Sequence, residues 1–454
     1  MADRAVLSLA LRPGGWRWGA LAFVLALGWG LAMPDTSLAQ GGSLPSAGLQ
    51  HALAQLLERA VSTHPSVQAK VAELGGSRAT LEAAQWQTYP SLSVQTERGN
   101  NQSTAAQPPN TSTSLRLQQT LWSGGRIAAS VHNAEWKERA AQYALQDSRA
   151  TVGLRTLEAW QGLLAAQGRQ QASTRLLVQL EKLNGMMARR IAQQISPAID
   201  GQLLRARLAQ AQSEQLSAAT GAEAARQRLV QWVGPGALAL LAWDAASLDL
   251  ADPLPLWPAD TVQQLQRAID RNPSLRRYDA DTAAAREELR QRQAERWPTI
   301  YARIERQFNS HAPFLGKTVE NTVYLGLQYN SGAGLSLRAQ VAAAQARSQS
   351  LEDDRASLLR QLQESYTSEW REYQATLARI GYAQSVQDSN ATLFESYTRL
   401  FVAGRRSWLE LLNALREQNA AHQSLTDLQA QQQASHGRLR LYLGAFAWQI
   451  EAAP

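Results

Sequence analysis

Histidine and cysteine are the side chains that most often bind metals or activate substrates, and this chain offers little of either chemistry. It contains no cysteine, which excludes disulfides, thiolate metal sites and a lipid-modified N-terminal cysteine. The glycine groups near residues 124 and 332 lack the lysine of a phosphate-binding loop and are typical of turns. The histidines show no metal-ligand spacing, so we predict a protein that is not an enzyme and has no metal or cofactor. They are His51, His64, His132, His311, His422 and His436.

Two predicted helix starts carry acidic side chains. Ser407 and Glu410 are three residues apart, the spacing of a capping box, in which each side chain binds the other residue's backbone amide. Asp200 closely follows Ser196 and Pro197, so it falls in a first helical turn, where the helix dipole favours an anion. Both carboxylates therefore have a local structural role available to them.

The composition limits the class of protein. The 454 residues include 45 basic and 38 acidic side chains, a net charge of +7, and 44% are hydrophobic. This is too polar for a helical membrane protein and too apolar for a disordered chain. The basic residues are dispersed along the sequence, whereas nucleic-acid binders usually concentrate them in a patch. We expect a folded protein that does not bind nucleic acid.

The N-terminal segment predicts export from the cytoplasm. Three arginines precede an apolar run at residues 18–32, and the small residues Ser37 and Ala39 follow. This order is typical of a signal peptide, which we place at residues 1–39. The run has about 15 residues, fewer than the roughly 20 that a membrane-spanning helix needs. No later segment qualifies, so we expect no transmembrane helix in the mature protein.

The mature chain contains an internal duplication. Ala60–Ser66 resembles Ala268–Ser274, and Tyr89-Pro90 resembles Trp297-Pro298 at the same offset of 208. Further along, the offset becomes 210, and there Asp200 aligns with Glu410. A long repeat of this kind takes precedence over chain length in deciding the domain count. The predicted units are a first repeat at 40–233, a connector at 234–258 and a second repeat at 259–454.

Each repeat has the same predicted order of elements. A helix that begins at Pro65 or Pro273 is followed by a hairpin, because apolar residues then alternate with period two. The four predicted strands lie at about residues 91–98, 114–122, 299–308 and 322–330. Helices at about 127–195 and 337–402 follow, each on the order of 100 Å long, and each is followed by a return helix of roughly 50 Å.

Four strands cannot close a barrel, which limits how the chain can exist in lipid. An open sheet there would leave unsatisfied edge groups that cost several kcal/mol each. The chain must therefore pool its strands with other copies of itself. Two chains would give eight strands and an interior filled by side chains, whereas three would give twelve strands and a wider lumen.

Over essentially its whole mature length the chain resembles the TolC-type outer-membrane efflux proteins. The resemblance rests on the two aromatic-proline pairs, the segment Leu121–Gly125, the duplication and the helix turn Gly404–Ala414. It implies a mainly α fold with a small β-barrel contribution, made of a duplicated helix, hairpin, long helix and return helix. In such a fold, a homotrimer forms a 12-stranded outer-membrane β-barrel and a periplasmic α-helical tunnel.

The resemblance also implies a function and partners. The chain would provide a passive, periplasm-spanning exit duct in the cell outer membrane. Its partners would be two further copies of itself, outer-membrane lipid, a periplasmic adaptor (membrane fusion) protein and an inner-membrane ABC or RND transporter. Ile195–Asp200 and Ser331–Ser336 look like segments of a subgroup that serves type I protein secretion, including adhesin export, which favours that cargo over small molecules.

In that family the periplasmic helix tips close like an iris, held by ionic and hydrogen-bonded contacts near the turns and by acidic residues that face the pore. The resemblance implies a gating role for five residues of the chain and an adaptor contact for five others. The gate and pore-constriction candidates are Asp200, Gln202, Arg406, Glu410 and Asn413. The adaptor-contacting candidates at the helix tips are Ser196, Pro197, Gly404, Arg405 and Ser407.

Alternatives stay open at these positions and for the whole chain. Asn413 is uncharged where the family often has an aspartate, which would weaken or alter a cation-selective acidic ring. Glu410 can be a helix cap, a pore residue or both. Arg406 can pair with Asp200 of a neighbouring helix, which the resemblance favours, or stay solvated. A periplasmic coiled-coil scaffold or adaptor without a barrel is the second hypothesis, and the four predicted strands argue against it.

Overall fold

The computed structural model describes residues 46–99, 110–236, 261–309, 319–330 and 336–450, all within one of the two compact units of the chain, Ser43–Pro454. The predicted signal peptide and most of the predicted connector lie outside the described residues. The glycine group at residues 332–334 lies outside them as well.

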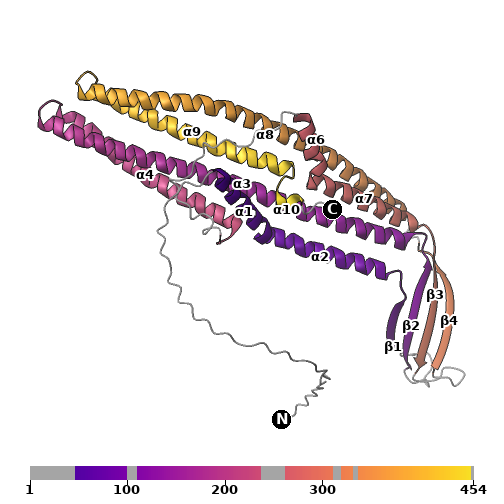
Figure 1. Ribbon diagram of the computed structural model, residues 1–454. Helices are drawn as coiled ribbons and strands as arrows, with labels where there is room; N and C mark the ends of the chain where they lie inside the picture. Colours follow the sequence, from indigo (N-terminus) through magenta and orange to yellow (C-terminus); the bar gives the residue numbers. More distant parts are fainter. Residues whose placement is uncertain (1–45, 100–109, 237–260, 310–318, 331–335, 451–454) are drawn as a thin grey trace, which may run out of the picture. The chain divides into compact units, whose positions relative to one another are not determined.

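The described part of the chain is mainly helical, as predicted, and contains one sheet of four strands. The same order of helix, hairpin, long helix and return helix occurs twice (Figure 1). The elements are α1 (Ser46–Thr63), α2 (Pro65–Trp86), β1 (Ser91–Gly99), β2 (Asn110–Trp122), α3 (Arg126–Ala192), α4 (Ala198–Val233), α6 (Thr261–Arg271), α7 (Pro273–Ala294), β3 (Thr299–Asn309), β4 (Val319–Gln328), α8 (Ser336–Val402), α9 (Trp408–Tyr442) and α10 (Ala447–Ile450).

The helices that lead into the two hairpins begin in the same way. Each has a proline in its first turn, where the missing N–H would have had no partner within the helix. In α2 the N-cap is His64, whose Nδ1 accepts a hydrogen bond from the Ser66 amide at 3.2 Å. In α7 the N-cap is Asn272, whose Oδ1 accepts one from the Leu275 amide at 3.0 Å. Each cap satisfies one of the free amides at a helix start.

The long helices form two helical hairpins. α3 and α8 have 67 residues each, which corresponds to about 100 Å. α3 packs against its return helix α4, and α8 against α9, while α9 also packs against α3. Figure 1 shows both hairpin turns at the end of the helices that lies away from the sheet. None of the described helices is both long enough and apolar enough to cross a bilayer.

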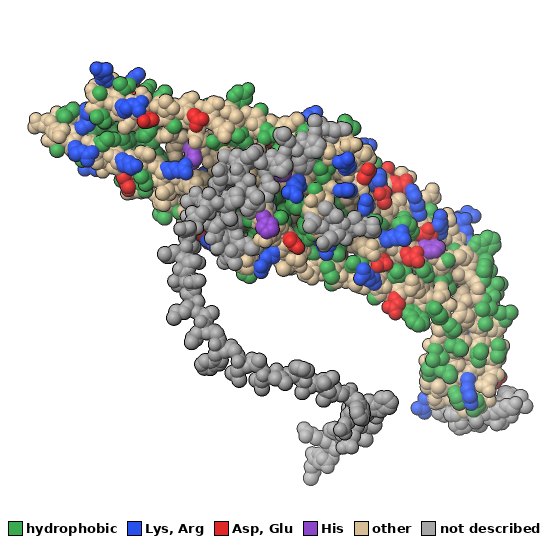
Figure 2. Space-filling view, viewed as in Figure 1, with side chains coloured by type: hydrophobic (Ala, Val, Ile, Leu, Met, Phe, Trp, Pro, Cys, Tyr) green, Lys and Arg blue, Asp and Glu red, His purple; other side chains and the backbone are tan. Residues whose placement is uncertain are grey.

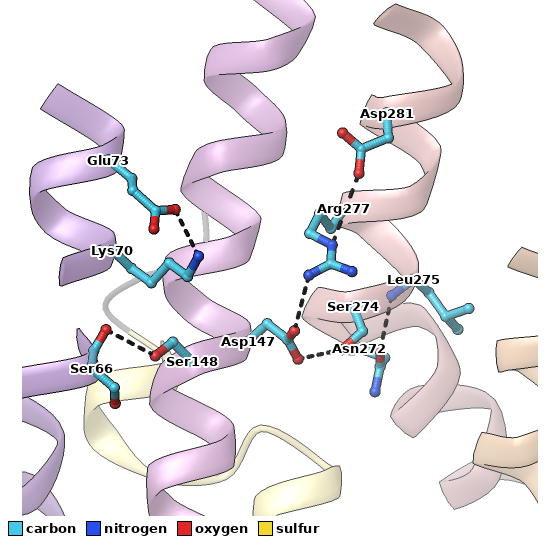
Figure 3. Close-up of polar contacts among 10 residues, drawn as sticks. All are labelled: Ser66, Lys70, Glu73, Asp147, Ser148, Asn272, Ser274, Leu275, Arg277 and Asp281. Carbon is cyan, nitrogen blue, oxygen red and sulfur yellow. Dashed lines mark hydrogen bonds and ion pairs between the residues drawn. The ribbon is translucent and has the colours of Figure 1, made fainter. Parts of the chain in front are cut away.

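α3 also holds α2 and α7, one on each side, through consecutive residues (Figure 3). The Ser148 hydroxyl donates a hydrogen bond to the Ser66 carbonyl of α2 at 3.5 Å. The Asp147 carboxylate accepts one from the Ser274 hydroxyl of α7, and it also pairs with the Arg277 guanidinium at 3.5 Å. Ser66 and Ser274 are aligned by the internal repeat, so equivalent serines in the two copies attach to the same turn of α3.

The four strands form one antiparallel sheet in the order β1-β2-β3-β4. Successive side chains of a strand point to opposite faces, so paired residues form rows across the sheet. One such row is apolar on all four strands: Leu92, Leu117, Ile304 and Val323. The adjacent row, on the other face, is polar: Ser93, Arg116, Glu305 and Thr322. In the polar row, Arg116 Nε donates to Glu305 Oε1 at 2.9 Å.

The strands extend further toward the hairpin loops than the apolar alternation predicts. β2 begins at Asn110, although the pattern predicts a start near residue 114. Its first residues are polar on both faces, so they carry no alternation, yet the pairing continues to Gly99 opposite Asn110. There the hydroxyls of Thr96 and Thr113 lie 3.2 Å apart. Backbone hydrogen bonds sustain the ladder where side-chain periodicity gives no sign of it.

The junction between sheet and helices joins two of the motifs found in the sequence. Trp297, of the second aromatic-proline pair, packs edge-on against Trp122 with ring centroids 6.4 Å apart. Gly124 has φ +62°, and a Cβ built there would lie 2.7 Å from the Cβ of Trp297. Glycine is therefore required at residue 124 for both its backbone conformation and its contact.

Candidate functional site at the hairpin turns

The two hairpin turns have the same backbone hydrogen bonds. In the first, the Ile195 amide donates to the Arg190 carbonyl at 2.9 Å. In the second, the Arg405 amide donates to the Leu400 carbonyl, also at 2.9 Å. These pairs are 210 residues apart, and both bonds are the long bond of a Schellman motif, which ends a helix by reversing the backbone. Both turns thus keep one geometry after duplication.

That geometry requires a left-handed residue in each turn. Gly404 supplies it in the second turn with φ +73°, which costs glycine nothing in steric terms. Gln194 supplies it in the first turn with φ 60°, and it is the one non-glycine residue with positive φ in the described part of the chain. A side chain in this conformation costs roughly 1–2 kcal/mol, so the first turn stores strain that the second does not.

The second turn is fastened by its own residues. Ser407 caps α9: its Oγ accepts a hydrogen bond from the Glu410 amide at 3.3 Å, and its own amide donates to Glu410 Oε2 at 2.9 Å. This is the capping box that the spacing predicts. The Arg406 guanidinium donates to Glu410 Oε1 and lies 4.8 Å from the ring centroid of Tyr397. Hydrogen bonds from the Ser407 amide and hydroxyl, followed by the one from Arg406, lower the pKa of Glu410.

The first turn is fastened to the other hairpin. Pro197 is the N-cap of α4 and offers no side-chain cap. The turn is held by Arg190 instead, whose Nε donates to Ser196 Oγ at 3.2 Å and whose Nη1 donates to the Phe401 carbonyl at 3.2 Å. The guanidinium also lies 4.6 Å from the Phe401 ring centroid. Arg190 therefore ties the end of α3 to the end of α8.

Sequence reasoning missed Arg190, although one signal was present. A basic residue in the last turn of a helix can bind the free carbonyls there, and Arg189 and Arg190 occupy that turn of α3. The contact anticipated for Arg406 with Asp200 is absent from the ion pairs of the described residues. Within one chain, Arg406 pairs with Glu410. The local partner four residues along is available without any second helix.

The remaining candidates fall in two places. Asn413 lines a hollow of about 130 Å³ between α3, α4 and α9, beside Leu409, Arg207 and Arg416. Gln202 and Asp200 do not line it. The candidates for adaptor contact lie in the two turns, and two of them, Pro197 and Ser407, are the N-caps of the return helices. Ser196 is half-buried and the other four are exposed. Their roles in a gate or in adaptor binding stay predictions.

Apolar side chains are exposed beside these polar groups. Ile195 and Ile199 are 58% and 65% exposed at the first turn, and Val402 and Leu409 are 62% and 58% exposed at the second. Behind them, a buried cluster that includes Leu180, Leu204 and Leu411 packs the two hairpins together. The turn end thus combines a packed interior with an apolar and charged surface.

The comparison with protein families identifies the chain. The model of the family described as outer membrane efflux protein matches residues 56–235 and 264–445. These two matches cover most of the sequence, so the chain belongs to the outer membrane efflux protein family. No curated protein matches the chain by sequence.

Solved structures of outer-membrane channels share the fold. The outer-membrane channel OprN is 18% identical with a TM-score of 0.77, and the match covers 90% of this chain and 94% of that one. VceC of Vibrio cholerae is 19% identical with a TM-score of 0.73, covering 88% of this chain and 99% of that one. The open state of MtrE of Neisseria gonorrhoeae is 16% identical with a TM-score of 0.63, covering 86% and 88%. OprN and MtrE are described as outer-membrane channels and VceC as an outer membrane protein, and these likenesses do not favour the coiled-coil scaffold hypothesis.

Proposed function

We propose that the chain is one subunit of a homotrimeric outer-membrane channel. In this proposal three copies pool their sheets into a twelve-stranded barrel in the outer membrane. Their helical hairpins form a passive tunnel across the periplasm, which receives substrates from an inner-membrane ABC or RND transporter through a periplasmic adaptor protein. The family membership and the fold shared with outer-membrane channels support this proposal.

The observation that carries the proposal is the two-sided character of the sheet. On one face apolar side chains are directly exposed, including Leu92 at 66%, Val323 at 75% and Leu325 at 77%. Figure 2 shows hydrophobic side chains along the strands. The other face carries the polar row with the Arg116–Glu305 ion pair. An apolar outer face and a polar inner face are what a barrel in lipid around an aqueous lumen requires.

The edges of the sheet support a trimer. β1 and β4 are the two edges, and neither pairs with a further strand in the described part of the chain. Exposed edges cost several kcal/mol per unsatisfied group in lipid, so neighbouring copies must pair β1 with β4. Three copies give twelve strands and a lumen wider than one filled by side chains. The 67 residues of α3 and α8 then extend this lumen by about 100 Å.

For the cargo we propose polypeptides exported by type I secretion, adhesins included, rather than small molecules. The support is the likeness of Ile195–Asp200 and Ser331–Ser336 to segments of protein-secreting members, and residues 331–335 lie outside the described residues. Deletion of the gene should then remove one or more large proteins from the culture supernatant or cell surface. Hypersensitivity to toxic small molecules with unchanged secreted proteins would contradict this cargo.

The channel itself is tested with neighbouring residues on opposite faces of β4. Val323→Arg places a charge on the apolar face, where it costs about 2–4 kcal/mol at the midplane of a bilayer, and should abolish the membrane-embedded, heat-modifiable oligomer. Thr322→Arg, on the polar face, should leave the oligomer and its conductance in planar bilayers intact. Equal tolerance of both variants, or recovery of the wild type in the soluble periplasm, would refute the channel.

A further inference from the structure

The hairpin turns hold a concentration of positive charge that the linear sequence does not show. Residues 185–214 and 395–424, which the repeat aligns, contain eight arginines and five carboxylates. The excess of three positive charges in these short segments compares with +7 for all 454 residues. Figure 2 shows Lys and Arg side chains around this end of the helices. Folding therefore brings dispersed charges together at the turn end.

The ion pairs at this end neutralise two of the five carboxylates, and the arginines that remain unpaired outnumber the unpaired carboxylates. Glu395 pairs with Arg399 at 2.8 Å, and Glu410 pairs with Arg406. Five further arginines are exposed and have no ion pair with any carboxylate of the described residues. They are Arg189, Arg205, Arg207, Arg405 and Arg416. Three carboxylates, Asp200, Glu214 and Glu417, likewise have no ion pair with the described residues, so five unpaired arginines face three unpaired carboxylates.

Two of these unpaired arginines belong to the hollow between the hairpins. Arg207 of α4 and Arg416 of α9 both line it, together with Asn413 and one carboxylate, Glu214. Two arginines against one carboxylate leave the lining with a net positive charge. Leu409, Asn413 and Arg416 are spaced at i, i+4 and i+7, so they share one face of α9. All three are exposed. The α9 face that carries the uncharged constriction candidate therefore carries an unpaired arginine one turn further on.

We propose that the turn end of the duct selects anions, and that its cargo enters as an anionic solute or as an acidic stretch of polypeptide. This rests on the proposed channel function. Threefold symmetry repeats the surplus in each subunit around one passage, and a narrow passage with low-dielectric walls focuses that field. Rings of arginine in a constriction attract anions for the same reason that acidic rings attract cations. Glu410 does not oppose this field, because Arg406 neutralises it.

The test is the reversal potential of the full mature protein in planar phospholipid bilayers under a KCl gradient. We expect chloride to be favoured over potassium by roughly threefold at low salt, and the preference to fall as salt rises, since screening shortens the range of the field. The double variant Arg207→Gln/Arg416→Gln should move the permeability ratio to about one or below.

A matched variant controls for charge lost elsewhere. Arg338 and Arg360 are also exposed, have no ion pair with the described residues, and lie in the half of α8 nearer the sheet. Arg338→Gln/Arg360→Gln removes the same number of unpaired charges and should leave the ratio unchanged. Asn413→Asp, which adds a carboxylate to the same α9 face, should shift the ratio toward potassium without removing an arginine.

The outcomes separate the inference from the channel function. A conducting wild type that favours potassium, equal shifts in the two double variants, or an Asn413→Asp variant with the wild-type ratio would each overturn the anion-selective turn end and leave the channel standing. A wild type that forms oligomers yet never conducts would overturn both. Chloride preference that only the Arg207 and Arg416 changes abolish supports the inference.

Discussion

The α3/α4 and α8/α9 hairpins have the same turn backbone and different fastenings. The second turn is closed by Ser407, Glu410 and Arg406, which lie within four residues of one another. The first lacks a side-chain cap and depends on Arg190, which reaches the Phe401 carbonyl of the other hairpin. The two copies share the turn geometry, but the second turn is held by contacts among its own residues and the first by a contact with the other hairpin.

The return helices differ as well. α4 buries only Leu, Ala and Val side chains. α9 packs against both long helices and buries polar side chains along its second half. They include Gln429, Gln432, Gln433, Ser435 and His436. The position aligned with His436 in α4 is Arg226, which is half-buried. The second hairpin is thus the more enclosed of the two, and acid should affect it first.

The largest effect should therefore come from lowering the pH. Burial, with a smaller contribution from Arg440, lowers the pKa of His436 to about 4 from 6.5. As the pH falls below 6.5, His436 takes up a proton in the unfolded chain but stays neutral in the folded chain. The free energy of unfolding therefore decreases between pH 6.5 and 4. The expected loss is roughly 3 kcal/mol. Urea unfolding of the detergent-solubilised protein across this range would measure it.

His436→Gln removes this titration and keeps a polar side chain at the site. Its unfolding free energy should vary less with pH than that of the wild type. His422→Gln serves as the comparison, because burial also lowers the pKa of His422 and its removal should flatten only part of the slope. An unchanged slope in His436→Gln would show that the enclosure of α9 is not what makes the protein acid-sensitive.

The next largest effect should come from the residues with left-handed backbone conformation, which differ between the two turns. Gly404→Ala should destabilise the second turn by about 1–2 kcal/mol, because alanine pays the left-handed penalty that glycine avoids. Gln194→Gly should relieve the same penalty in the first turn and stabilise it by up to about 1 kcal/mol. Urea midpoints would report both changes. A loss of stability in Gln194→Gly would mean that the glutamine side chain contributes more than its conformation costs.

Sequence reasoning predicted the elements of these hairpins better than their contacts. Helix period, prolines and the Ser407–Glu410 spacing are local signals, so the long helices and the capping box could be predicted. Arg190 was missed because its partner, Phe401, is 211 residues away along the chain. The start of β2 at Asn110 was missed because a polar run carries no periodicity. The charge of the turn end was missed because it exists only once both repeats are folded together.

A smaller effect should follow from cutting the link between the hairpins. Leu400 occupies the position of Arg190 in the second repeat, so Arg190→Leu makes the first turn resemble the second there. The lost hydrogen bonds to Ser196 and Phe401 should cost about 1 kcal/mol and speed hydrogen exchange of the amides at Ile195 and Arg405. Arg189→Leu, at the exposed neighbour, should leave exchange unchanged. Equal exchange rates in the two variants would show that Arg190 does not link the two hairpins.

The smallest effect on stability should come from Glu410→Gln, which bears on whether this residue only caps α9. Glutamine retains an oxygen to accept the Ser407 amide, so the box persists in part, while the charge and the ion pair with Arg406 are lost. The freed arginine adds one positive charge per subunit at the turn end, so the chloride preference should rise while the urea midpoint stays nearly unchanged.

Asp200→Asn, the aligned change in the first turn, removes a carboxylate that takes part in no ion pair with the described residues. It should raise the chloride preference without removing a capping hydrogen bond. Similar shifts in the two variants would mean that the pore responds to the net charge of the turns and not to the different contacts that hold each turn.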